Sequence, residues 1–93
     1  MKSNRKKLKN NLLEIAKLLE NKRNIVIEQT LDSMIYFVSK SNYYRIIIPH
    51  EGNQFRWMFQ RARKSGFDRW ANSTNETRYC KNVSEIYSRL KRI

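Results

Sequence analysis

The fold of this chain is decided by residues 34–48, MIYFVSKSNYYRIII, in which two apolar runs flank a short polar segment. β-Branched and aromatic residues dominate both runs, as is typical of strands. The polar residues 39–42 have the composition of a turn. A similar run, residues 25–27, precedes them, and residues 30–33 supply another turn. These segments predict a three-stranded antiparallel meander, which Pro49 ends because proline cannot donate to a strand ladder.

Helical periodicity lies on both sides of this meander. Before it, apolar residues recur with a period near 3.6 and predict a helix from about Lys6 to Asn21. After it, four apolar residues at i, i+3, i+4 and i+7 predict a second helix over residues 53–66, with Asn53 as N-cap and Gly66 after its end. The two apolar stripes comprise Leu8, Leu12, Ile15, Ala16 and Leu19, then Phe55, Met58, Phe59 and Ala62.

The last part of the chain predicts a short strand–strand–helix extension. Residues 69–71 and 77–80 are strand-like, and Asn82 with Glu85 resembles a capping box at the start of a last helix. The apolar face of that helix comprises Val83, Ile86, Tyr87 and Leu90. We therefore expect one small α+β domain over residues 1–93, with an α-β-β-β-α core, an antiparallel sheet and a short β-β-α extension.

A formal net charge of +12 on 93 residues indicates a polyanionic partner, because self-repulsion destabilises a small basic domain. Candidate partners are nucleic acid, an anionic membrane surface and an acidic protein. Residues 1–23 carry +6 and residues 53–93 carry +7, whereas residues 24–52 carry −1. The basic residues in 53–93 lie far along the chain from those in 1–23, and aromatic residues lie among them. Both features favour nucleic acid over a membrane as the partner. Residues 1–7 are either a flexible basic arm or the first turns of the helix.

The predicted second helix is the strongest candidate for a binding surface. Arginine binds phosphate and guanine edges, glutamine binds adenine, and tryptophan stacks on unpaired bases. The alternative interpretation is a solvated basic face with Trp57 partly in the core. Lysines of the N-terminal basic run and one arginine of the extension, Arg69, are further candidate binding residues. The candidate nucleic-acid-binding residues are Lys6, Lys7, Lys9, Arg56, Trp57, Gln60, Arg61, Arg63, Lys64 and Arg69.

The sequence predicts no catalytic site, cofactor or metal. His50 is the only histidine and stands beside Glu51, so a metal-independent ribonuclease that uses His50 is the alternative function. The carboxylates form no paired motif for Mg²⁺, and the lone Cys80 provides neither a zinc site nor an intramolecular disulfide. The sequence contains no bilayer-spanning apolar run and no signal peptide, so we expect a cytoplasmic protein without membrane contact.

Several short motifs resemble a known family: a leucine-rich first helix, Asp32-Ser33-Met34-Ile35-Tyr36, IIIPHEG over residues 46–52 and KSGF over residues 64–67. Through them residues 12–67 resemble the HicA-type mRNA interferase toxins, which have a double-stranded-RNA-binding-like α-β-β-β-α fold. That family's catalytic histidine follows a Gly-Ser pair, where this chain has Met34. Because methionine cannot transfer a proton, the resemblance implies binding without cleavage. The element order is also similar to the double-wing DNA-binding domain of phage transcription activators.

The expected function is therefore non-catalytic binding of DNA or RNA through basic helices. The abundance of Asn, Lys and Ile, which have A/T-rich codons, indicates an A/T-rich bacterial, phage or plasmid genome. A phage- or plasmid-encoded regulatory factor is one form that such a protein would take. Two alternatives stay open: the ribonuclease that uses His50, and an accessory protein that docks on an acidic host protein. The sequence does not choose between DNA and RNA, and it does not give the oligomeric state.

Overall fold

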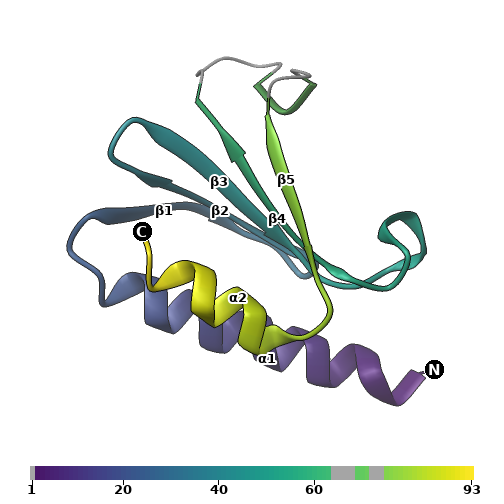
Figure 1. Ribbon diagram of the computed structural model, residues 1–93. Coiled ribbons are helices and arrows are strands. Elements are labelled where there is room, and N and C mark those ends of the chain that lie inside the picture. The colour runs from purple at the N-terminus through teal and green to yellow at the C-terminus, as the bar shows by residue number, and fades with distance from the viewer. Residues whose placement is uncertain (1, 64–68, 72–74) are drawn as a thin grey trace.

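The computed structural model describes residues 2–63, 69–71 and 75–93. Its helices are α1 (Lys2–Glu20) and α2 (Val83–Leu90), with short 3₁₀ helices η1 (Glu51–Asn53) and η2 (Arg69–Ala71). Its strands are β1 (Ile25–Thr30), β2 (Met34–Ser39), β3 (Asn42–Ile47), β4 (Trp57–Ala62) and β5 (Glu76–Cys80). The five strands form one antiparallel sheet in chain order. Both helices cover the same face of this sheet (Figure 1).

The hydrophobic core lies between the sheet and the two helices. Strand alternation decides which residues enter it: in β2, Ile35 and Phe37 are fully buried, and Phe37 stacks on Tyr44 with ring centroids 5.0 Å apart. The apolar faces of the two helices form the opposite side of the core. Its fully buried side chains include Leu12, Ile15 and Leu19 from α1, and Ile86 and Leu90 from α2. Lys22, just after α1, donates to the Leu90 carbonyl at 3.1 Å and so ties the ends of both helices together.

Several predictions from the sequence are confirmed. The protein is of the α+β class, its first three strands form the predicted meander, and its last helix begins after the N-cap Asn82. Helix α1 begins at Lys2, so the N-terminal basic run forms its first turns. Within the described residues, neither helix is long and apolar enough to cross a membrane.

The predicted helix over residues 53–66 is wrong, because its described part contains the last residue of η1 and then the strand β4. Trp57 and Phe59 alternate along β4 and both enter the core on the helix side. Ala62 pairs with Tyr43 and lies on the opposite face. Phe59 fits both the helical stripe and the strand alternation, and pairing with β3 and β5 selects the strand. Gly66, expected after the helix end, lies outside the described residues.

The predicted strand at residues 69–71 is also wrong, because these residues form η2. This short helix packs on the sheet face away from α1 and α2. The Arg69 guanidinium lies 4.0 Å from the Tyr43 ring centroid, and the Arg45 guanidinium lies 4.5 Å from that of Trp70. Cation–π contacts of this kind hold the segment against the sheet without needing strand pairing.

Candidate nucleic-acid interface

A cleft of about 860 Å³ lies where the first half of α1, the loop after β3 and the start of α2 meet. Figure 1 shows these three segments gathered near the N-terminal end of α1. The apolar part of the lining includes Ile48, Pro49 and the buried Trp57. The cleft therefore joins parts of the chain that are far apart in sequence.

Positive side chains dominate the ionic lining of the cleft. Arg5 and Lys7 come from α1, and Lys81 comes from the residues just before α2. Among the residues that the structure describes, none of these three is in an ion pair. One lining carboxylate, that of Glu51, faces them. A concave surface lined by one sign of charge focuses the field and attracts anions.

The loop after β3 is fixed by a buried asparagine. The Asn53 side chain is 2% exposed, accepts from the His50 backbone N–H at 2.7 Å and donates to the Ile48 carbonyl at 3.0 Å. The Phe55 backbone N–H then donates to the His50 carbonyl at 2.8 Å. These bonds satisfy the polar groups of a loop that has no strand partner. Asn53 is thus not the predicted N-cap; His50 has that position in η1.

Two consecutive residues of this loop have left-handed backbone. Gln54 has φ 57° and Phe55 has φ 59°, although neither is glycine. For a bulky residue this conformation is a genuine outlier, and such strain often accompanies functional sites. Phe55 lines the cleft and is 71% exposed. The loop therefore holds an aromatic ring in solvent beside the cleft cations, where hydrophobic burial alone would not place it.

His50 also lines the cleft, and its ring orientation is fixed locally. Its Nδ1 accepts a hydrogen bond from the Gly52 backbone N–H at 3.0 Å. A neutral imidazole that accepts at Nδ1 carries its proton at Nε2, so the second nitrogen is a donor. A Cβ atom at Gly52 would lie 2.8 Å from the Cε1 atom of His50, so any larger residue would displace the ring. This geometry suits His50 to donate to an anionic oxygen.

The predicted binding residues of the 53–66 segment do not share one surface. Arg56 is exposed between the loop and β4, whereas Trp57 is only 2% exposed and cannot stack on a base in this structure. Gln60 lies on the sheet face away from the helices, where it accepts from Arg45 and donates to Thr77 at 2.8 Å. Lys64 lies outside the described residues. Strand geometry therefore separates the side chains that a helix would have aligned.

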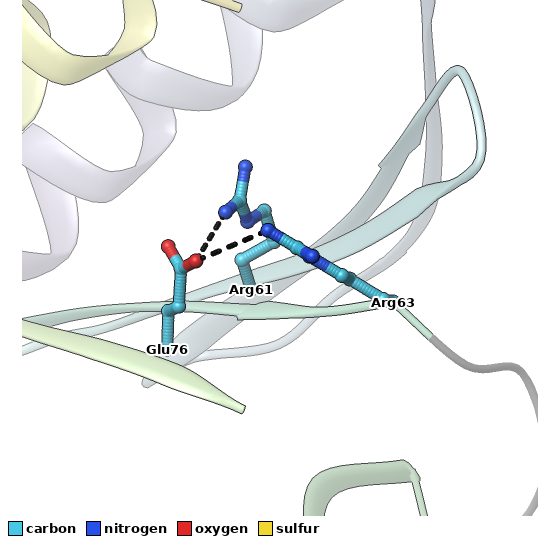
Figure 2. A network of polar contacts seen from close by, with 3 residues as sticks. All are labelled: Arg61, Arg63 and Glu76. Atoms are coloured by element: carbon cyan, nitrogen blue, oxygen red, sulfur yellow. Dashed lines mark hydrogen bonds and ion pairs between the residues drawn. The ribbon is translucent and has the colours of Figure 1, made fainter. Parts of the chain in front are cut away.

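Arg61 and Arg63 both contact the carboxylate of Glu76 on β5 (Figure 2). The hydrogen bond from Arg61 holds the pKa of Glu76 below its ordinary value, and the same contact raises the pKa of Arg61. Arg63 lies 3.5 Å from the carboxylate, with its side chain 74% exposed. These two predicted residues thus belong to an ion-pair network away from the cleft.

The remaining predicted residues lie on three different surfaces. Lys6 and Lys7 are exposed on α1, and Lys7 lines the cleft. Lys9 forms an exposed ion pair with Asp32 at 3.3 Å. Arg69 lies on the opposite side of the sheet, where it contacts Glu28 at 3.3 Å. Of the predicted set, Lys7 and Trp57 are the residues that line the cleft, and Trp57 contributes only its buried edge.

Sequence reasoning missed Arg5, Lys81 and Phe55 as cleft residues. Lys81 directly precedes the Asn82 N-cap, which accepts from the Glu85 backbone N–H at 3.2 Å, and its position follows from where α2 docks. Phe55 was assigned to the apolar stripe of the predicted helix, because its spacing to Phe59 fits a helical period. The motif Pro49-His50-Glu51-Gly52 was the sequence signal that did mark this end of the molecule.

The described residues contain no group of three or more His, Cys, Asp or Glu side chains that could hold a metal ion. Comparison of the chain with protein-family models, curated proteins and solved structures finds no match. The resemblance to HicA-type toxins therefore stays a prediction. The chemistry of the cleft has to be inferred from its own side chains.

Proposed function

We propose that this protein binds nucleic acid without cleaving it, and that the cleft beside α1 and α2 is the binding site. The observation that carries the proposal is the combination of Arg5, Lys7 and Lys81 with the exposed ring of Phe55. Lysine and arginine neutralise phosphates, and an exposed aromatic ring stacks on an unpaired base. The pairing of these two features favours a single-stranded segment, of either DNA or RNA, as the ligand.

The orientation of His50 supports anion binding over general-base catalysis. A general base must accept a proton, yet Nδ1 already accepts from the Gly52 N–H, and Nε2 carries the proton in the neutral ring. Met34 stands where the resemblance to HicA-type toxins implies a catalytic histidine; it is the first residue of β2 and cannot transfer a proton. His50 is therefore proposed to donate from Nε2 to a phosphate oxygen.

The proposal is tested with a triple variant, Arg5→Gln, Lys7→Gln and Lys81→Gln. A matched control removes three exposed cations away from the cleft: Lys17→Gln, Arg23→Gln and Lys40→Gln. Fluorescence anisotropy with a single-stranded oligonucleotide is measured at several salt concentrations. The cleft variant should bind more weakly than the control, and its salt slope should fall by roughly 0.7 for each phosphate that it no longer neutralises. Equal affinities and slopes in the two variants would overturn the assignment of the cleft.

The two alternative functions predict different results in the same experiment. A ribonuclease would shorten labelled RNA and lose this activity in His50→Ala. A protein that docks on an acidic host protein would bind no oligonucleotide in any variant. In a pull-down it would instead bring down a protein partner that nuclease treatment does not remove. Neither result is expected from the proposed nucleic-acid-binding function.

A further inference from the structure

A second, smaller pocket of about 180 Å³ lies at the C-terminal end of α2. It shares no lining residue with the cleft. Four arginines line it: Arg61 on β4, Arg78 on β5, Arg89 in α2 and Arg92 just after α2. Tyr44 and Phe59 supply aromatic edges from the core side. The pocket therefore collects guanidinium groups from three separate elements.

The charges in this pocket are not balanced by the protein. The one side-chain carboxylate in the lining, that of Glu76, is already shared by Arg61 and Arg63. Within the part of the chain that the structure describes, Arg78 and Arg92 form no ion pair. Guanidinium groups that line one small pocket repel one another, because arginine side chains stay protonated in proteins. An anion in the pocket would remove that repulsion.

A second, independent observation concerns Arg61. Its Nε–H is buried and has no hydrogen-bond acceptor among the described residues. Its terminal nitrogen already donates to Glu76, so the carboxylate does not satisfy the Nε–H. Buried N–H groups are nearly always paired, so the Arg61 Nε–H is available to an acceptor from water or from a bound anion. An oxyanion beside Arg61 would supply it.

We propose that this arginine pocket binds a phosphate monoester. A monoester carries close to two negative charges and three strong acceptor oxygens, which suits several guanidinium forks at once. The arginine pocket, at about 180 Å³, is much smaller than the cleft of about 860 Å³, which favours a phosphate group over a whole nucleotide inside it. An internal phosphodiester also has a sugar on both sides and one charge. The chemistry fits either the end of a nucleic-acid strand or a free phosphate ester, and it does not depend on the proposed function of the cleft.

The first arm of the test uses inorganic phosphate and needs no nucleic acid. Arginine Nε–Hε resonances of the wild-type protein are followed by NMR as chloride is exchanged for phosphate at constant ionic strength. We expect a saturable shift that includes the Arg61 Nε–Hε resonance. The variant Arg78→Gln, Arg92→Gln should weaken phosphate binding by tenfold or more, since it removes two charge-assisted donors. Arg89 is kept, because it contacts the buried thiol of Cys80.

The matched control for this arm is Lys17→Gln, Arg23→Gln, which removes the same charge outside the pocket. The second arm compares oligonucleotides that are identical except for a terminal phosphate or a terminal hydroxyl. A preference of about tenfold for the phosphorylated end that disappears only in the pocket variant would identify a strand end as the source. Saturable binding of inorganic phosphate without that preference would identify a free phosphate ester. The absence of both effects, or equal effects of the pocket and control variants, would overturn the proposal.

Discussion

Substitutions at Phe55 can separate the contribution of its backbone conformation from that of its ring. Its φ of 59° lies in the left-handed region, which costs a non-glycine residue roughly 1–2 kcal/mol. The ring is 71% exposed, so its burial contributes little to stability. Phe55→Ala removes the ring and keeps the strain, whereas Phe55→Gly removes both. The two variants therefore differ in how well the new residue accepts the left-handed conformation and in its freedom in the unfolded chain.

The expected order of stability is the reverse of the usual one. Glycine normally destabilises a folded chain by about 0.5–1 kcal/mol relative to alanine, through its greater freedom when unfolded. Subtracting this cost from the relieved strain leaves Phe55→Gly more stable than Phe55→Ala by about 0.5–1 kcal/mol. Arg56 provides the matched control, because it is exposed, adjacent and without positive φ. There we expect the glycine variant to be the less stable one.

Urea denaturation followed by circular dichroism measures both pairs of variants, and anisotropy with a single-stranded oligonucleotide measures binding. Both Phe55 variants should bind more weakly than wild type by a similar factor, since each lacks the stacking ring. If Phe55→Gly is less stable than Phe55→Ala, as at Arg56, the left-handed strain is not present in solution. If both bind as tightly as wild type, the ring does not contact nucleic acid.

Three further predictions concern the core, the acid dependence of stability and the histidine. Phe37→Ala should destabilise the fold by about 3–5 kcal/mol in urea denaturation, because the ring is fully buried; an unchanged midpoint would contradict the packing. Arg61 lowers the pKa of Glu76 from its ordinary 4.5, so this carboxylate stabilises the fold above pH 4.5 and loses that effect as pH falls through the lowered pKa. The difference in urea midpoint between wild type and Glu76→Gln should therefore shrink on acidification, and a constant difference would refute this. His50→Ala should weaken oligonucleotide binding while RNA stays intact with both proteins; cleavage by wild type that disappears in this variant would overturn the binding-only proposal.

The parts of the fold that were predictable are those with one dominant local pattern. The meander has β-branched runs separated by turn residues, and α2 has both an apolar face and the Asn82 N-cap. The segment from Phe55 to Ala62 has no such pattern, because its apolar residues satisfy a helical and a strand period together. Its state is set by hydrogen bonds to β3 and β5, which lie elsewhere in the sequence. Hydrogen bonding between strands that are distant in sequence cannot be predicted from the local residue pattern.

The candidate site was predictable in its chemistry and not in its position. Net charge indicated a polyanion, but the cleft needs Arg5 and Lys81 together, which only tertiary structure brings about. The left-handed Phe55 could not be foreseen, since glycine or asparagine normally marks that conformation. The four arginines of the smaller pocket are likewise spread from Arg61 to Arg92, with no common motif.

The order of strands in the sheet, which follows the order in the chain, has a consequence for folding kinetics. Each strand pairs with its successor, so sheet formation involves mostly local contacts and should be fast for a β-rich domain. The contact of longest sequence separation is made when α2 docks and Lys22 reaches the Leu90 carbonyl across 68 residues of sequence, which carries a larger loop-closure entropy. Both cationic pockets take lining residues from 81–93. A chain that has formed its sheet but has not docked α2 would therefore lack both pockets, so anion binding reports on completed folding.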